Sequence, residues 1–281
     1  MGRWFASYLL TEGLQITLAG RSRQKLEEAA RELGCRSASM QEAVKQAEAI
    51  VISVPIDSFE TVVREMAPHI RPGQYVFDIT SVKERPVEIM HKYLSGCRIL
   101  GTHPMFGPGA ASLKGQRFVF TPVGDEEKSL ATQLSRQIEG RGARGTVMSP
   151  AEHDRLMGMV LGLPHFIALV SADTLLSLNS LKQAGEVSGT SFRLLLTLAE
   201  AVLSEDPDFY SSLQMSLPDM AGIEETFLAK TELWLDLVRK HDGERFAQRM
   251  RDLREQLERE DPDFTAGYRK MYRMREGPDV S

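Results

Sequence analysis

Apolar and polar residues alternate along the first half of the chain in short blocks that predict strands and helices in turn. Apolar runs that predict strands cover residues 14–19, 49–54, 75–77, 98–100, 117–121 and 143–147. Between them, helical spacing covers residues 2–12, 22–33, 40–46, 57–66 and 126–140, with Ser22 as an N-cap and glycines at positions 13 and 34 as helix ends. This alternation predicts a parallel, doubly wound α/β sheet.

The predicted sheet begins with a helix where a dinucleotide-binding unit would begin with a strand. Such a unit has a strand, a Gly-x-Gly-x-x-Gly turn and then a helix. Gly2 fits the last glycine of that turn, and the first strand and two glycines would then lie upstream of Met1. Because the first strand lies in the middle of such a sheet, its absence predicts open ladder edges on its two neighbours. Alternatively, Gly2 is there by chance.

The pattern changes to helical spacing near Met148, where we place the domain boundary. Ser149 and Pro150 suit the N-cap and first turn of a helix, and no convincing strand pattern follows them. The expected division is a dinucleotide-binding domain over residues 1–147 and an all-helical domain over residues 148–281.

Two helical segments of the second half carry long apolar faces. The run 156–173, uncharged up to its last residue, is just too short to span a membrane and contains Pro164, so we expect a buried core helix and no membrane span. The segment 220–272 is amphipathic and rich in both charge signs. Its apolar stripe predicts packing against a partner subunit, and therefore a homodimer.

Charge and cysteine content narrow the class of protein. The 281 residues include 34 Lys and Arg and 39 Asp and Glu, a net charge of −5, which argues against non-specific nucleic-acid binding. Cys35 and Cys97 have no metal-type spacing and indicate reduced thiols in a cytoplasmic protein. The six histidines include no pair at i, i+4 spacing, so we expect no metal site.

The residues that carry chemistry follow two neighbouring strands. Ser81 lies in the turn 78–83 after the strand 75–77, and His103 lies in a glycine- and proline-rich loop, 101–109, after the strand 98–100. Ligands of open α/β sheets bind at the carboxyl ends of strands. We therefore expect His103 to be the chemical centre, as a neutral imidazole that accepts a proton.

The cofactor preference is suggested by the end of the strand 14–19. NAD sites carry an acidic residue near this point, whereas an arginine suits the 2′-phosphate of NADP. Here Arg21, Ser22 and Arg23 follow the strand, and the first acidic residue is Glu27. This favours NADP; the alternative is a solvated basic helix start.

Several motifs together resemble the prephenate dehydrogenase family, particularly its archaeal-like branch. In chain order they are Ser53-Val54-Pro55, Asp78-Ile79-Thr80-Ser81-Val82-Lys83, Gly101-Thr102-His103-Pro104-Met105-Phe106-Gly107-Pro108, His153-Asp154, Leu163-Pro164-His165 and Arg193. The resemblance covers nearly the whole chain except its front. It implies a Rossmann-like domain, here without its first strand, followed by an all-α dimerisation domain.

The resemblance also implies an activity and roles for particular residues. The family oxidises and decarboxylates prephenate to 4-hydroxyphenylpyruvate for tyrosine synthesis and passes a hydride to NAD(P)+. His103 would accept the proton of the ring hydroxyl, Ser81 would orient His103, Arg193 would bind a substrate carboxylate, and His165 would face the same pocket. The positions expected to contact the cofactor are Gly2, Arg21, Ser22, Ser53, Pro55 and Ser81. His153 is expected to be a surface or interdomain residue at a helix start.

Other hypotheses stay open at this stage. The substrate could be arogenate in place of prephenate. The chain could be a non-catalytic dimerising remnant without the cofactor phosphate loop, or Met1 could be a misplaced start; the reading frame upstream of Met1 would discriminate these. A different dehydrogenase, acting on a small hydroxy acid, would need a catalytic lysine, and Lys182 has no convincing motif around it.

Overall fold

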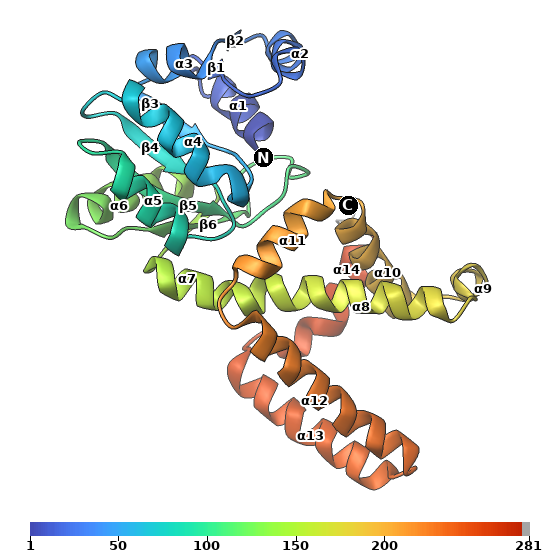
Figure 1. The fold of residues 1–281 in the computed structure, drawn as a ribbon. Coiled ribbons are helices and arrows are strands. Elements are labelled where there is room, and N and C mark those ends of the chain that lie inside the picture. The colour runs from blue at the N-terminus through green and yellow to red at the C-terminus, as the bar shows by residue number, and fades with distance from the viewer. Residues whose placement is uncertain (277–281) are drawn as a thin grey trace. The chain divides into compact units, whose positions relative to one another are not determined.

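The computed structural model describes residues 1–276, which form two compact units. The first contains residues 1–157 and 211–218, and the second contains residues 158–210 and the described residues from 219 onward. All described strands belong to the first unit (Figure 1). The domain boundary near Met148 stays a prediction; the contacts group the helix that follows it, α7 (Pro150–Met157), with the sheet.

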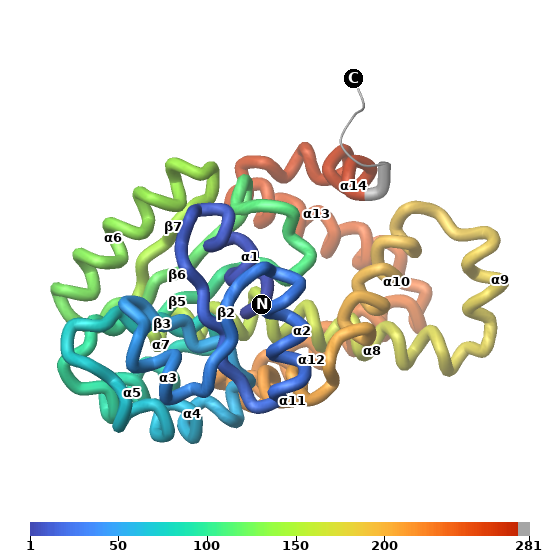
Figure 2. Tube along the Cα trace, turned by 90° about the horizontal axis from the view of Figure 1, so that it is seen from above, coloured from blue at the N-terminus to red at the C-terminus, as the bar shows by residue number. Residues whose placement is uncertain are grey.

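The first unit is built on a five-stranded sheet in the order β3-β4-β5-β6-β7, and Figure 2 shows β3, β5, β6 and β7 following one another across it. Its strands are β3 (Ala49–Ile52), β4 (Tyr75–Asp78), β5 (Arg98–Pro104), β6 (Arg117–Thr121) and β7 (Arg144–Val147). Neighbouring strands are parallel except β5 and β6, which are antiparallel. The expected α/β sheet is therefore confirmed, but it is mixed and not purely parallel.

A second, two-stranded sheet pairs β1 (Thr17–Leu18) with β2 (Arg36–Ser37) in parallel. Among the described residues no strand joins β1 to β3, so each has one side without a ladder partner. At β3 this side leaves Val51 37% exposed, which is unusual for a valine in the middle of a doubly wound sheet. The expectation of open edges on these two strands is confirmed.

Helices cover both faces of the five-stranded sheet because successive strand residues point to opposite sides. Val76 and Ile99 pack in one core with the helices α4 (Phe59–Met66) and α5 (Glu84–Tyr93), whereas Phe77 and Leu100 pack in another with α1 (Gly2–Thr11) and α6 (Asp125–Glu139). The helices of this unit are α1 (Gly2–Thr11), α2 (Arg23–Leu33), α3 (Met40–Gln46), α4 (Phe59–Met66), α5 (Glu84–Tyr93), α6 (Asp125–Glu139) and α7, with 3₁₀ turns η1 (Ile56–Ser58) and η2 (Ala67–His69). The sequence pattern predicted these helices except α5.

The second unit is helical throughout its described residues, as expected. It contains the π-helical turn η3 (Gly158–Gly162), α8 (Leu163–Ser177), α9 (Leu181–Glu186), α10 (Thr190–Leu203), α12 (Met220–Arg239), α13 (Gly243–Glu260), η4 (Phe264–Ala266) and α14 (Gly267–Glu276), while α11 (Pro207–Ser216) is divided between the units. The π turn precedes Pro164, which has no N–H to donate to the carbonyl four residues earlier.

The apolar segment at the start of this half is exposed to a greater degree than expected. Pro150–Ser177 is long and apolar enough to cross a membrane, by length and composition only, and it is the one such helix among the described residues. The prediction of a buried core helix is wrong for the single chain, because Ala168 and Ala172 are the buried residues of α8 whereas Val170 and Leu176 are exposed. Apolar surface of this kind is typical of a face that another surface covers.

Candidate active site

The candidate site lies at the carboxyl ends of β4 and β5, the edge that the sequence predicted. Asp78 ends β4 and pairs with Gly101 of β5, and His103 follows two residues later. His103 was expected in a loop after residue 100, and this expectation is wrong because β5 continues to Pro104.

The strand continues because β6 takes over as its partner. Beyond Gly101, β5 pairs with β6 in antiparallel register, with His103 opposite Val119 and Pro104 opposite Phe118. The amide of Met105 donates to the carbonyl of Arg117 at 2.9 Å, so the alternation of an antiparallel ladder leaves Pro104 at a position that needs no N–H. His103 is thus fixed by a ladder and not by a loop.

His103 is 5% exposed, and its ring contacts a second histidine. Its Nδ1 lies 2.8 Å from Nε2 of His153, and Nδ1 of His153 lies 2.6 Å from Oδ1 of Asp154. His153 is fully buried, so the prediction of a surface or interdomain residue is wrong. The reason is that Ser149, just before α7, caps the helix by accepting the amide of Glu152, so the first turn of α7 lies at the sheet edge.

Asp154 is held in turn by the first amides of α5. Its Oδ1 accepts the backbone N–H of Lys83 at 2.6 Å, and its Oδ2 accepts that of Glu84 at 2.9 Å. These are N–H groups that a helix start leaves without an intrahelical partner, and a carboxylate is favourable there. Asp154 therefore joins α7 to α5 and fixes the direction of the His153 ring.

A buried ion pair lies under His103. Lys83 and Asp78 are both fully buried and form a salt bridge, and Nζ of Lys83 also donates to the carbonyl of Thr102 at 2.7 Å. Oδ1 of Asp78 accepts the amide of Thr102 at 3.2 Å. The pair thus holds the backbone of the residue before His103. Burial lowers the pKa of Lys83, and the nearby Asp78 charge opposes that effect.

The surroundings of His103 favour its neutral form. Burial lowers its pKa well below the usual value of 6.5, and the positive charge of Lys83 and the ring of His153 act in the same direction. At physiological pH the imidazole is therefore uncharged and can accept a proton. This is the state that a general base needs before it reacts.

Ser81 lies beside this site but does not hydrogen-bond to His103 among the described residues. It is partly buried in the turn between β4 and α5, and the ring partner of His103 is His153. Its expected role in orienting His103 stays a prediction. The sequence missed His153, Asp154 and Lys83 as members of the site, although all three stand in motifs that carry the family resemblance. The sequence pattern does not show that His153 contacts His103, 50 residues away, or that Asp154 accepts the amide of Lys83, 71 residues away.

The residues expected to contact a dinucleotide lie in the same unit. A Cβ added to Gly2 would stand 2.9 Å from Oγ of Ser53, so the absence of a side chain lets the start of α1 approach the end of β3. No side chain caps α1, which leaves its first N–H groups available to a phosphate, as helix starts commonly are. These features fit a dinucleotide.

The remaining cofactor positions are consistent with the same site but less specific. Arg21 and Ser22 are exposed at the start of α2, and Ser22 is its N-cap as predicted. Pro55 is exposed and precedes η1.

Two further candidate residues belong to the second unit. His165 lies in the first turn of α8, edge-on to Tyr210 with ring centroids 4.8 Å apart, and its Nδ1 is buried without a hydrogen-bond partner among the described residues. Burial lowers its pKa. Arg193 is exposed in the first turn of α10. An arginine with an exposed head and a histidine with an unpaired ring nitrogen are both suited to bind a polar ligand.

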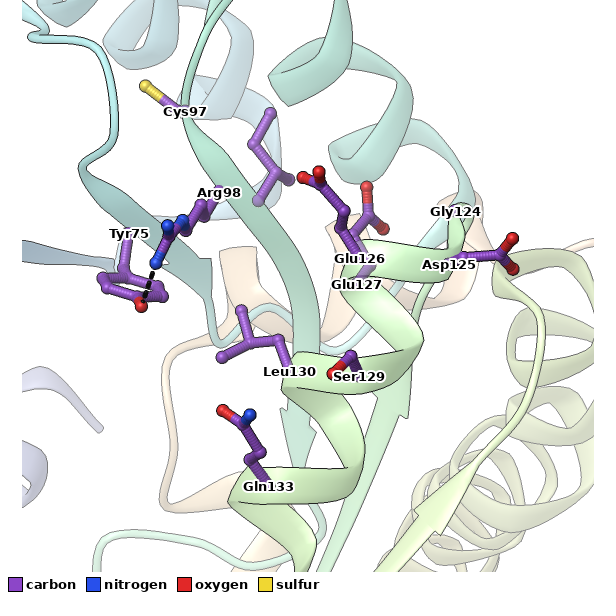
Figure 3. Close-up of a pocket in the computed structure, with 11 residues that line it drawn as sticks. Tyr75, Cys97, Arg98, Gly124, Asp125, Glu126, Glu127, Ser129, Leu130 and Gln133 are labelled. Carbon is purple, nitrogen blue, oxygen red and sulfur yellow. Dashed lines mark hydrogen bonds between the residues drawn. The ribbon is translucent and has the colours of Figure 1, made fainter.

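A separate cavity of about 470 Å³ lies at the amino ends of the strands β4 and β5, away from the candidate site (Figure 3). Tyr75 and Arg98, the first residues of β4 and β5, line it together with Glu126 and Glu127 of α6. Arg98 already donates a hydrogen bond to the Tyr75 hydroxyl (Figure 3). Since open sheets bind ligands at the carboxyl ends of their strands, we assign this cavity no part in the site.

Comparison with known families matches both halves of the chain. The model described as "Prephenate dehydrogenase, nucleotide-binding domain" matches residues 5–147, and the model described as "Prephenate dehydrogenase, dimerization domain" matches residues 149–252.

Individual relatives agree with these matches. The chain is 33% identical to a probable arogenate/prephenate dehydrogenase of Methanocaldococcus jannaschii over 90% of this chain and 57% of that protein. It is 30% identical to the T-protein of Enterobacter agglomerans over 70% of this chain and 52% of that protein. The chain therefore spans little more than half the length of these relatives.

The solved structure of prephenate dehydrogenase from Aquifex aeolicus, in complex with hydroxyphenyl propionate and NAD+, superposes with a TM-score of 0.76. The two chains are 20% identical, and the match covers 93% of this chain and 95% of the other. At this identity the superposition supports the fold alone.

Proposed function

The chain belongs to the prephenate dehydrogenase family, and on this premise we propose that it oxidises and decarboxylates prephenate to 4-hydroxyphenylpyruvate in the synthesis of tyrosine. The observation that carries the proposal is the buried, neutral imidazole of His103 at the carboxyl edge of the sheet. Arogenate, which has an amino group on the side chain in place of the keto group, is the alternative substrate. One relative in the comparisons is named for both substrates.

The reaction requires the protein to position the substrate and the cofactor and to accept one proton. The ring hydroxyl gives its proton to His103, the hydrogen on the same carbon leaves as hydride, and carbon dioxide is lost as the ring becomes aromatic. The nicotinamide cofactor supplies the hydride acceptor when it is bound. Because aromatisation is strongly favourable, His103 needs to act only as a positioned base.

We propose that the dinucleotide is held at the start of α1 and the end of β3. Gly2 and Ser53 would stand beside its phosphates, with Pro55 and Ser81 along its path and Arg21 and Ser22 near its ribose. The lack of an acidic residue in this last stretch favours NADP over NAD. In the helical unit, Arg193 would bind a substrate carboxylate and His165 would contribute a polar contact.

We further propose a cytoplasmic homodimer. The second family model is described as a dimerization domain, and helices of the second unit expose several large apolar side chains, among them Val170, Leu176 and Leu198. A twofold partner would cover such a surface. Cys35 and Cys97 are both free, which suits a reducing compartment.

His103→Asn tests the activity. It keeps a polar group near Nδ1 but removes Nε2, so we expect turnover of prephenate to fall by about 10²- to 10⁴-fold, the usual contribution of a general base. Cofactor affinity should stay within about threefold, since the residues proposed to hold the phosphates and the ribose lie at α1, β3 and α2 and are unchanged. His91→Asn, at an exposed histidine of α5, is the matched control. Both substrates and both cofactors should be compared with each variant.

Near-normal turnover by His103→Asn would overturn the role of His103. The open edges of β1 and β3 favour one competing hypothesis, a dimerising protein that binds no dinucleotide. Titration with NADPH and NADH, followed by their fluorescence, separates the two: absence of binding to the dimer supports the competing hypothesis whatever the variant does.

A further inference from the structure

Hydrogen bonds connect His103 through His153 and Asp154 to the start of α5. The chemistry of Asp154 determines which atom donates in each of them. Asp154 accepts two backbone N–H groups, from Lys83 and Glu84, and both bonds favour the ionised carboxylate. An ionised carboxylate can only accept hydrogen bonds. The ring nitrogen of His153 that faces Asp154, Nδ1, must therefore carry the hydrogen.

The tautomer of His153 in turn determines the tautomer of His103. A neutral imidazole carries one hydrogen, so His153 with a hydrogen on Nδ1 has a bare Nε2 that accepts. The atom facing it at 2.8 Å, Nδ1 of His103, must be the donor. His103 then carries its only hydrogen on Nδ1, and its Nε2 has a free lone pair. Among the side chains that the structure describes, none hydrogen-bonds to that nitrogen.

We propose that His153 and Asp154 are positioning residues that hold His103 in the tautomer whose Nε2 accepts the substrate proton, and that His153 takes over the resulting charge. The proposal rests on the proposed function for its substrate and on the geometry alone for the tautomer. Without Asp154 either ring nitrogen of each histidine could carry the hydrogen, and part of the population would present an N–H to the hydroxyl that must lose its proton.

The charge moves through two proton transfers, and in each of them one bond to hydrogen breaks as another forms. The substrate O–H bond breaks as an N–H bond forms at Nε2 of His103. The Nδ1–H bond of His103 then breaks as an N–H bond forms at Nε2 of His153, which becomes imidazolium. The positive charge now lies beside Asp154 and away from Lys83, whose like charge opposes a cation on His103. His103 ends neutral, with its hydrogen on Nε2.

Nitrogen-15 NMR of histidine-labelled protein tests the tautomer without any substrate. Protonated and bare ring nitrogens of a neutral imidazole have well-separated shifts, and loss of one signal set in His103→Asn assigns His103. In the unaltered chain we expect a hydrogen on Nδ1 and none on Nε2. A hydrogen on Nε2, or a mixture of both forms, would overturn the proposal.

Two substitutions of His153 distinguish its role as hydrogen-bond acceptor for His103 from its role as proton acceptor. His153→Gln places an amide near the former Nε2 and can still accept from His103, but it takes up no proton. His153→Leu removes the acceptor altogether. We expect His103 to keep its tautomer in the glutamine variant and to show both tautomers in the leucine variant. An unchanged tautomer in both variants would refute a positioning role for His153.

Steady-state kinetics of the same two variants test the role in the reaction. We expect kcat to fall by about 10- to 100-fold in His153→Leu and by less in His153→Gln, with KM within about threefold in each, because the loss lies in proton transfer and not in binding. Equal losses in both would refute tautomer control, and no loss in either would refute the whole role. His91→Gln is the control.

The pH profile provides a second readout. The ionisable groups around His103 are His153 and Asp154 of α7, Asp78 at the carboxyl end of β4 and Lys83 just before α5. His153→Leu removes the ring that takes over the charge, and His103 alone is buried beside the like charge of Lys83, so the acid limb of kcat/KM should move to lower pH. If NMR finds the expected tautomer while no substrate turns over, the proposed function fails and the tautomer assignment stands.

Discussion

Removal of the Lys83 ammonium should lower the free energy of unfolding of the sheet unit by several kcal/mol, because it leaves a buried charge without a partner. Lys83 is fully buried, and it donates to Asp78, to the hydroxyl of Thr80 and to the carbonyl of Thr102. Lys83→Met keeps most of the apolar stem but leaves the Asp78 carboxylate buried without a cation. Breaking a buried pair in this way costs about 3–5 kcal/mol. That is at least about a fifth of the roughly 5–15 kcal/mol by which a typical domain is stable.

Urea unfolding measures the loss in the correct unit. The chain has two tryptophans, and Trp4 lies in the sheet unit, where it stacks on Tyr8. In a Trp234→Phe background, Trp4 fluorescence therefore reports this unit alone. With a slope of about 2 kcal/mol per molar urea, the midpoint should fall by about 1.5–2.5 M.

Two controls decide whether the buried charge is the cause. Lys240→Met breaks an exposed pair with Asp236, whose side chains are 65% and 55% exposed, and should cost less than about 1 kcal/mol. The double variant Asp78→Asn with Lys83→Met removes the unpaired charge and should recover at least half of the loss. A Lys83→Met midpoint within about 0.5 M of the unaltered chain, or a double variant no better than the single one, would refute the reasoning.

Two other outcomes follow from the same region. Because the folded-state pKa of His103 lies below its unfolded value, the unfolded chain binds more protons than the folded one as pH falls through 6.5. The free energy of unfolding should therefore drop by up to about 1.4 kcal/mol from pH 7.5 to 5.5. His103→Asn should remove this part of the pH dependence. An equal slope in that variant, in urea titrations at both pH values, would contradict this. Gly101→Ala would place a Cβ 2.6 Å from Val87 and against Thr121, so we expect a loss of about 1–3 kcal/mol by thermal or urea unfolding. Gly107→Ala, with open space around it, should be neutral, and equal effects would show that crowding is not the cause.

The sequence by itself determined the order of the elements and the edge that carries the site. Strand and helix periods depend on local spacing, so β4 and α3 could be predicted nearly to the residue. The end of a parallel strand is also a local feature, which is why His103 could be placed at the carboxyl edge. The place of Gly2 in a glycine turn was indicated by the sequence, but its closeness to Ser53 was not. The helix α5 was missed because its first turn is capped by Asp154, far away in the sequence.

Tertiary structure alone decided what surrounds His103. Nothing local shows that β5 gains β6 as an antiparallel partner and so continues past Gly101. Nor does it show that the first turn of α7 brings His153, 50 residues later, to the imidazole. The type of each residue is fixed by the sequence, but the proton it carries depends on which atom lies opposite. For His103 that atom belongs to His153, and its state is set by Asp154.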